Sequence, residues 1–170
     1  MKGEVASVEK VRFVVVCDGA AGSIKRKLRK APAQFITTYQ TFHKGTIDIV
    51  PHFFFAFLHP ELSEYDAWFN AKDDYLIFGV AVKDTALIGH YHAVFMDFMR
   101  GKFGARVGEP VQSEKWVMPQ IVSGCPVDYG EGRVLFAGET AGFLNPMGEG
   151  ISAGLESGHA AAVAVLGMDG

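Results

Sequence analysis

The stretch that decides the fold is Gly132-Arg-Val-Leu-Phe-Ala-Gly-Glu-Thr-Ala-Gly-Phe-Leu-Asn-Pro-Met-Gly-Glu-Gly-Ile-Ser-Ala-Gly-Leu-Glu-Ser-Gly-His159. It opens with the apolar run Val134 to Ala137, which has the length and residue types of a buried strand. Gly138 ends the run, and an acid, Glu139, follows at once. After a glycine-rich loop, small and apolar residues predict a helix over Ile151 to Leu166. The stretch therefore predicts a strand, a loop and a helix in that order.

The loop between this strand and helix has the composition of a ligand-binding turn. Gly142, Gly148 and Gly150 let the backbone approach a ligand closely. The free N–H groups at the start of the helix can face a phosphate or another electron-rich group. An ordinary strand–loop–helix joint of an α/β domain accounts for the same pattern equally well, so the rest of the chain has to decide.

The segment Gly138-Glu-Thr-Ala-Gly-Phe-Leu-Asn-Pro-Met-Gly-Glu-Gly-Ile151 resembles the second flavin-binding motif of a large flavoprotein family. This family includes the para-hydroxybenzoate-hydroxylase-type monooxygenases and the geranylgeranyl reductases, and the Asn-Pro and Gly-Glu-Gly-Ile parts are closer to the reductases. The resemblance implies that Glu139, where the family usually has Asp, bonds a ribityl hydroxyl of FAD. The cofactor-binding residues that it implies in this segment are Gly138, Glu139, Pro146, Gly148, Glu149, Gly150 and Ile151.

A second strand–loop–helix pattern lies near the start of the sequence. Val11 to Val16 is apolar apart from Arg12, and it predicts a strand that is buried on both faces. The run leads into Cys17-Asp-Gly-Ala-Ala-Gly-Ser23 and then into a basic helical stretch, Ile24 to Lys30. A strand that ends in an acid and a glycine before a helix places both at a ligand-binding edge of a sheet.

This second pattern resembles the Asp-Gly motif of the same flavoprotein family. The resemblance implies that Asp18 and Gly19 lie near the FAD pyrophosphate. We expect Val11–Cys17 and Val134–Ala137 to be neighbouring or near-neighbouring strands of one sheet, with the Ile151 helix packed against it.

The middle of the sequence has the texture of an antiparallel sheet, rich in β-branched and aromatic residues. Lys72-Asp-Asp74 predicts a hairpin loop, and Thr85 to Phe103 predicts a helix with one apolar face. Strands are expected at Gln34–Phe42, Thr46–Ile49, His52–Leu58, Glu64–Asn70, Tyr75–Val82 and Val111–Met118.

Trp68-Phe-Asn-Ala-Lys72 resembles the Tyr-x-Trp-x-Phe-Pro-Lys segment of the geranylgeranyl reductases. The resemblance implies a small apolar substrate in a cavity walled by this sheet, on a concave surface next to the Pro146 loop. The residues expected to line it are Phe53, Phe55, Tyr65, Trp68 and Phe69. An aromatic-rich sheet that packs on an ordinary core explains the same residues without a cavity.

These patterns together predict an α/β (α+β) fold, in which a partial FAD-binding Rossmann-like domain carries an inserted antiparallel-sheet substrate domain. The expected segments are 1–31 for the first part of the FAD-binding domain, 32–112 for the substrate domain and 113–170 for the returning part.

Composition excludes several other classes of protein. The 170 residues carry a net charge of −3, and Lys25-Arg-Lys-Leu-Arg-Lys30 is an isolated basic cluster without aromatic residues, which argues against nucleic-acid binding. The two cysteines, Cys17 and Cys125, lack the spacing of a disulfide framework or zinc site, so no metal is expected. Reduced thiols and the absence of a signal-peptide pattern after Met1 lead us to expect a cytoplasmic protein.

The Gly-x-Gly-x-x-Gly loop that holds the FAD pyrophosphate in this family has no counterpart in the sequence. One hypothesis is a fragment of an FAD-dependent oxidoreductase, a reductase or monooxygenase of an apolar or isoprenoid-like substrate with NAD(P)H as electron donor. It implies a missing N-terminal half or partner chain, and peripheral membrane contact. No side chain has the pattern of a compulsory catalytic acid or base. The other hypothesis is a non-catalytic module that folds without flavin.

Overall fold

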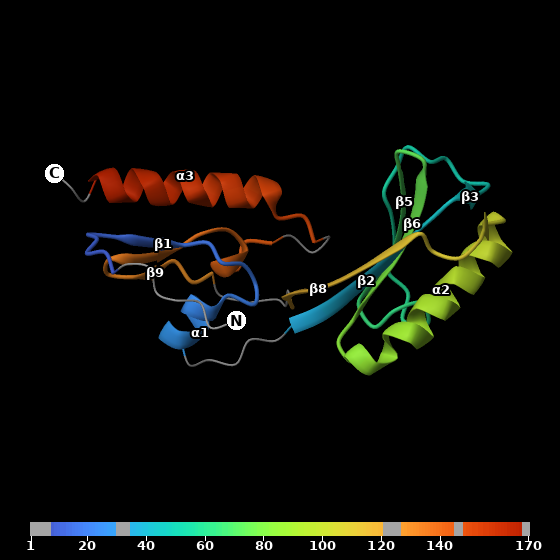
Figure 1. Ribbon diagram of the computed structural model, residues 1–170, viewed down its shortest axis with the longest axis horizontal. Helices are drawn as coiled ribbons and strands as arrows, with labels where there is room; N and C mark the ends of the chain where they lie inside the picture. The colour runs from blue at the N-terminus through green and yellow to red at the C-terminus, as the bar shows by residue number, and fades with distance from the viewer. Residues whose placement is uncertain (1–7, 30–34, 121–126, 145–147, 168–170) are drawn as a thin grey trace. The chain divides into compact units, whose positions relative to one another are not determined.

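The computed structural model describes residues 8–29, 35–120, 127–144 and 148–167 (Figure 1). The chain divides into two compact units. Unit 1 combines Met1–Pro32 with Ile121–Gly170, and unit 2 is Ala33–Gln120. The expected α/β (α+β) class is confirmed, with strands in both units and few helices.

Unit 1 is built on a three-stranded sheet with the order β1-β10-β9. The strands are β1 (Val14–Val16), β9 (Gly130–Glu131) and β10 (Val134–Phe136). β1 and β10 are parallel, with Val16 opposite Phe136, whereas β9 and β10 form an antiparallel hairpin. The prediction that the two ends of the sequence supply neighbouring strands of one sheet is therefore confirmed.

The burial expected for the first strand is wrong for most of its length. Val16 is buried against Phe136 and Ala141, but Val14 and Val15 are 39% and 42% exposed. β1 lies at the edge of the described sheet, so its other edge and parts of both faces have no cover among the described residues. An apolar run indicates a strand that can be buried and does not by itself show which neighbours bury it.

The helices of unit 1 are α1 (Ser23–Leu28), the short 3-10 helix η2 (Gly138–Thr140) and α3 (Ile151–Gly167). α3 packs on η2 with a face of small residues, and its hydrogen bond to η2 runs from the Gly138 N–H to Ser157 Oγ at 2.8 Å. A Cβ on Gly138 would lie 3.8 Å from the Gly154 Cα, at ordinary van der Waals distance. α3 therefore lies close to the turn that follows β10, where the sequence predicted a helix packed on the sheet.

Unit 2 contains a five-stranded antiparallel sheet with the order β4-β5-β6-β2-β8. Its strands are β2 (Phe35–His43), β4 (Phe55–Phe57), β5 (Asp66–Lys72), β6 (Tyr75–Val82) and β8 (Gln112–Pro119). β3 (Gly45–Thr46) and β7 (Arg106–Val107) form a separate short pair. The hairpin at Asp73-Asp74 is confirmed, because β5 and β6 pair from Lys72 opposite Tyr75 to Asp66 opposite Ala81.

Helix α2 (Ile88–Phe103) follows the 3-10 turn η1 (Thr85–Leu87) and lies along one face of this sheet (Figure 1). It ends at Gly104, which has the left-handed conformation expected of a helix C-terminus. The core between helix and sheet is formed mainly by Phe69, Phe78, Phe95 and Met99, all fully buried. The predicted helix over 85–103 is thereby confirmed apart from its first, 3-10 turn.

Two strands are shorter than expected, since β4 covers only Phe55–Phe57 and β3 only Gly45–Thr46. The strand Gln112–Pro119, which the sequence assigned to the returning domain from residue 113, pairs with β2 along its whole length. It therefore belongs to the sheet of unit 2, and the return to unit 1 comes after Gln120.

Candidate functional site

The two loops with resemblance to flavin-binding motifs meet in unit 1. Gly19 donates its backbone N–H to Thr140 Oγ1 at 2.7 Å, and Lys25 Nζ donates to the Thr140 carbonyl at 2.6 Å. Both loops follow the carboxyl ends of adjacent parallel strands, β1 and β10. In open α/β sheets this edge is where ligands bind, so the register of the strands places both motifs at one candidate site.

The Asp18 carboxylate is used within its own loop. Oδ2 accepts the N–H of Ile24 in the first turn of α1 at 3.0 Å, and Oδ1 accepts the Thr140 hydroxyl at 3.4 Å. A Cβ on Gly22 would lie 2.0 Å from Oδ1, so only glycine leaves room for this arrangement. Asp18 therefore fixes the start of α1 and joins it to Thr140.

Gly19 and Glu139 face each other across the site. Gly19 has φ +78°, and a Cβ built on it would lie 3.9 Å from Glu139 Oε2. Burial raises the pKa of the Glu139 carboxyl, and a hydrogen bond from the Ala20 backbone N–H lowers it in part. Glu139 is only partly buried, so it keeps acceptor capacity toward a ligand beside the Gly19 backbone.

The start of α3 differs from the expectation of free N–H groups. Glu149 Oε1 accepts the N–H of Ile151 at 2.9 Å and the N–H of Ser152 at 3.4 Å. The chain's own carboxylate thus occupies the positive end of the helix, where the sequence predicted a ligand. Gly148 and Gly150 flank it, and Pro146 lies outside the described residues.

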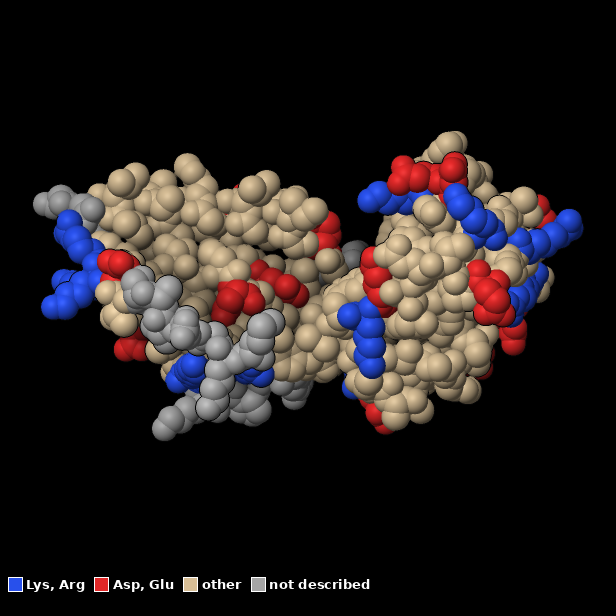
Figure 2. Space-filling model, viewed as in Figure 1, with Lys and Arg blue, Asp and Glu red and all other residues tan. Residues whose placement is uncertain are grey.

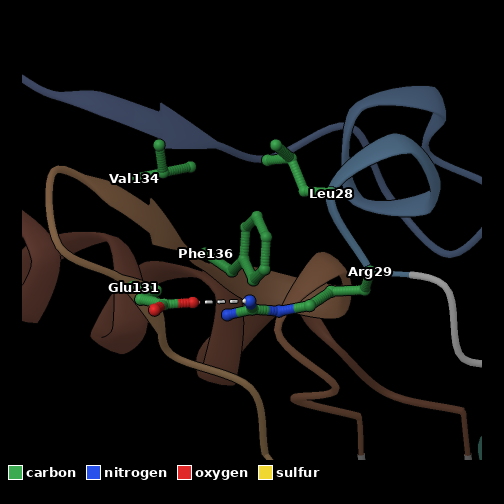
Figure 3. Close-up of a pocket in the computed structure, with 5 residues that line it drawn as sticks. All are labelled: Leu28, Arg29, Glu131, Val134 and Phe136. Atoms are coloured by element: carbon green, nitrogen blue, oxygen red, sulfur yellow. Dashed lines mark hydrogen bonds and ion pairs between the residues drawn. The ribbon is translucent and has the colours of Figure 1, made fainter.

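A small pocket of about 190 Å³ lies elsewhere in unit 1, between α1 and the β9–β10 hairpin (Figure 3). Arg29 donates to Asp128 and to Glu131, both at 3.0 Å, and lies over the ring of Phe136. The Arg29 guanidinium lowers the pKa of the Asp128 carboxyl. Arg29 and Asp128 form an ion pair with each other, so their polar groups are not available to a ligand. We therefore assign this pocket a structural role, in which Arg29 connects α1 to the hairpin. It contains none of the predicted site residues; its lining is Leu28, Arg29, Glu131, Val134 and Phe136.

The expected substrate residues separate onto different parts of unit 2. Phe69 is fully buried in the core beneath α2, and Phe55 packs against it with a ring separation of 6.1 Å. Phe53 is exposed, and Tyr65 is half-buried at the start of β5. Their predicted proximity to the Pro146 loop stays a prediction, because Pro146 is not among the described residues.

Trp68 lies on the sheet face opposite to Phe69, since successive side chains of a strand alternate. Its indole ring covers Gly79 on β6, where a Cβ would come within 2.0 Å of the ring, and its Nε1–H donates to Gln40 Oε1 at 3.4 Å. Burial raises the pKa of Asp66, two residues earlier on the same face, to about 6. We call this side of the sheet the Trp68 face.

Sequence reasoning missed the residues that hold the unit 1 site together. Thr140 follows Glu139 directly, but only the pairing of β1 with β10 shows that its hydroxyl meets Gly19. Ser157 is a polar residue among the small residues of α3, and that was the only signal in the sequence. The structure shows that its hydroxyl oxygen accepts the Gly138 N–H. Among the described residues, no cluster of three or more His, Cys, Asp or Glu side chains could hold a metal ion.

Comparison with solved structures agrees with this architecture. A geranylgeranyl bacteriochlorophyll reductase-like protein from Thermoplasma acidophilum aligns with 90% of this chain at 17% identity and a TM-score of 0.70. A flavin-dependent halogenase, CmlS, aligns with 85% at 16% identity, and a triple mutant of a flavin-dependent brominase aligns with 85% at 17% identity, each with a TM-score of 0.50. The chain therefore shares the fold of part of such flavoproteins, which confirms the resemblance at the level of fold.

The chain spans 40% of the length of the reductase-like protein, 28% of the halogenase and 40% of the brominase. No protein-family model matches the sequence, and no curated protein matches it. Across the part of the chain that the structure describes, no helix is both long and apolar enough to cross a membrane.

Proposed function

We propose that this chain forms the flavin-facing part of an FAD-dependent oxidoreductase that acts on an apolar or isoprenoid-like substrate. One observation carries the proposal. The Asp18-Gly19 loop and the Glu139-Thr140 turn, more than a hundred residues apart, are hydrogen-bonded to each other at the carboxyl ends of two parallel strands. The fold shared with flavin-dependent enzymes supports it.

The residues at this edge fit a flavin nucleotide in their chemistry. Gly19 leaves an open backbone beside Glu139, whose carboxyl can accept a hydrogen bond from a ribityl hydroxyl. The remaining residues proposed to bind the cofactor, by contact or by positioning, are Asp18, Gly138, Pro146, Gly148, Glu149, Gly150 and Ile151. Asp18 and Glu149 take part in internal hydrogen bonds, so we assign Asp18 a positioning role and expect the Glu149 side chain to turn away when FAD binds.

A bound flavin supplies hydride transfer, with NAD(P)H as the proposed electron donor. The chain's own contribution is to bind and orient the flavin. Glu139 would hold the ribityl chain of a bound flavin, and the start of α3 would stabilise negative charge on it once Glu149 has moved. Unit 2 contributes the substrate side through Tyr65 and Trp68, whereas Phe55 and Phe69 support the sheet from the core.

We further propose that another stretch of protein covers α3 and β1, either an N-terminal half or a partner chain. α3 turns a stripe of large apolar side chains outward, and the surface over α3 shows few charged groups (Figure 2). The exposed residues of the stripe are Ile151, Leu155, Val163 and Leu166. An apolar helix surface of this kind is also suited to peripheral membrane contact, and the open edge of β1 can pair with a further parallel strand.

The alternative is a non-catalytic module that folds without flavin. The internal hydrogen bonds of Asp18 and Glu149 favour it, because the polar groups at the start of both helices are satisfied without a ligand. The two functions differ in what FAD does to the protein. A flavoprotein binds FAD at Gly19 and Glu139, and a ligand-free module does not.

Titration of the purified protein with FAD, followed by flavin fluorescence, tests the proposal. We expect weak binding by residues 1–170 and tight binding when the chain is joined to a pyrophosphate-binding segment. Weaker binding by Glu139→Ala in both cases would place the cofactor at this edge. Equal binding by wild type and Glu139→Ala would assign the cofactor to another surface and favour the ligand-free module.

A further inference from the structure

Asp66, on the Trp68 face of unit 2, is a buried carboxyl that has no partner among the described residues. The residue is 8% exposed, and no described residue donates a hydrogen bond or forms an ion pair with its side chain. Every fully buried side-chain nitrogen or oxygen of the described residues does have a hydrogen-bond partner. The Asp66 oxygens therefore keep a small exposure to solvent, where they can meet a ligand.

The side chains beside this carboxyl on the sheet face carry no charge. Asp66 pairs with Ala81 on β6, and the next residue across the sheet is Thr38, whose hydroxyl donates to the Trp116 carbonyl. Trp68 is the following residue on the same face of β5. The neighbour of Asp66 across the sheet is thus the small side chain of Ala81. The Trp68 indole and Thr38 border this position, and the Thr38 hydroxyl already donates a hydrogen bond.

Charged groups nearby do not neutralise Asp66. Glu64, just before β5, accepts the backbone N–H groups of Lys83 and Asp84, which follow β6. Glu114 on β8 accepts from the amide of Gln40. Tyr65 is the residue whose pKa the Asp66 charge raises, after the larger effect of burial. The Lys83 ammonium forms no ion pair with Asp66 in the described structure.

We infer that Asp66 is the polar anchor of a ligand-binding position on the Trp68 face, which takes an apolar molecule through its single hydroxyl group. An ionised carboxyl can only accept hydrogen bonds, so it selects a ligand that donates one. The apolar side chain of Ala81 and the indole of Trp68 select the hydrocarbon part. The inference rests on the proposed function, because it defines the apolar substrate as an alcohol. Asp66 and Trp68 then take the place of Phe55 and Phe69 as the expected substrate contacts.

The burial of Asp66 also sets the pH range in which its carboxyl should prefer an alcohol over an ether. Its pKa is raised to about 6, so the carboxyl is an acceptor at about pH 8 and a donor at about pH 5. In acid it can donate to an ether oxygen as well as to an alcohol. The preference for an alcohol over its methyl ether should therefore exist above the pKa and disappear below it.

Trp68 and Trp116 are the two tryptophans of the protein, so Trp116→Phe leaves Trp68 as a fluorescent reporter beside Asp66. In this background we would titrate octanol and octyl methyl ether at about pH 8 and about pH 5. The expected result is roughly tenfold tighter binding of octanol at about pH 8 and similar binding of both at about pH 5. Asp66→Leu should lose the preference, whereas Asp74→Asn, at a side chain that is 90% exposed, should keep it.

Equal affinity for alcohol and ether at both pH values, or an unchanged preference in Asp66→Leu, would overturn the inference. Tighter binding of octylamine than of octanol would overturn the assignment to a hydroxyl. Asp66→Asn provides a second, sterically conservative variant if Asp66→Leu fails to fold, and it should lose the pH dependence. The alcohol titration needs no flavin, so the two proposals can fail separately. A protein that binds FAD but does not prefer octanol contradicts only this inference. A protein that prefers octanol but does not bind FAD contradicts only the flavin proposal.

Discussion

Gly19 and Thr140 are 121 positions apart in the sequence, yet the Gly19 N–H lies 2.7 Å from the Thr140 hydroxyl oxygen. This hydrogen bond joins the loops that follow β1 and β10, and it exists because those strands are parallel neighbours. Thr140 is almost fully buried, so its hydroxyl has no access to water as a substitute partner. The bond therefore holds the geometry of the proposed flavin site.

Replacing Thr140 by Val should loosen this site without changing the shape of the side chain much. The Gly19 N–H and an Asp18 oxygen lose a partner, which should lower the free energy of unfolding by about 1–3 kcal/mol. Hydrogen exchange of the Gly19 amide, measured by NMR, should become faster in the variant. Thr140→Ser keeps the hydroxyl and serves as the control; equal protection of Gly19 in Thr140→Val and wild type would contradict this role.

Gly79→Ala should displace the Trp68 indole. A Cβ at this position would lie 2.0 Å from the ring, so the ring or the strand has to move, at a cost of about 1–3 kcal/mol. Near-ultraviolet circular dichroism and tryptophan fluorescence should both change. Gly89→Ala is the matched control, since a Cβ there has no atom within 4 Å and alanine favours the helix by about 1 kcal/mol. A Gly79→Ala protein with wild-type spectra and stability would show that the ring does not rest on Gly79.

Buried Asp66 and partly buried His92, both in unit 2, should make stability depend on pH in opposite directions. Burial, with a smaller effect of His43, lowers the pKa of His92 to about 4, so its contribution to stability is lost as the pH falls from 6.5 toward 4. Burial raises the pKa of Asp66 to about 6, so its contribution is lost as the pH rises from 3.8 toward 6. Each shift corresponds to about 3 kcal/mol, and the two largely cancel in the wild type.

Asp66→Asn should expose the effect of His92 alone. Urea unfolding should then show stability rising by up to about 3 kcal/mol between about pH 4 and pH 6.5, where the wild type changes little. His92→Gln should give the opposite slope, because only Asp66 then titrates. The same slope in Asp66→Asn and in the wild type would mean that Asp66 has an ordinary pKa.

Glu149→Gln should separate the two functions considered for unit 1. The carboxylate now holds the N–H groups of Ile151 and Ser152, and glutamine keeps an acceptor there but removes the negative charge. If the start of α3 receives the flavin, FAD affinity should rise several-fold, because the competing charge at the helix dipole is gone. Glu156→Gln, further along α3 and exposed, is the control and should leave FAD affinity unchanged. An unchanged affinity in Glu149→Gln would remove the α3 terminus from the flavin site.

The secondary structure could be predicted where the local pattern was long and regular. The helix expected over Ile151–Leu166 is observed as Ile151–Gly167, and the hairpin at Asp73-Asp74 is observed with its expected strands. Strand alternation also places Asp66 and Trp68 on one face, although the sequence reasoning did not use it. These features depend on residues close together in the chain.

Other features depend on contacts that no local pattern contains. Neither the exposure of Val14 and Val15 at a sheet edge nor the capping of α3 by Glu149 follows from hydrophobic periodicity. Phe55 and Phe69 look like cavity residues in the sequence, but β4 and β5 turn both of them toward the core beneath α2. Aromatic composition predicts burial, and only the sheet register decides whether a core or a ligand buries the side chain.

The most direct test of the account is an NMR titration of ¹⁵N-labelled protein with FAD, which detects binding even at a dissociation constant of about 1 mM. We predict saturable shifts that share one dissociation constant at the amides of Gly19, Ala20, Glu139 and Ile151, and a several-fold weaker constant in Glu139→Ala. Shifts confined to the pocket at Arg29, or no shifts at these four amides at millimolar FAD, would contradict a flavin site at the joined ends of β1 and β10.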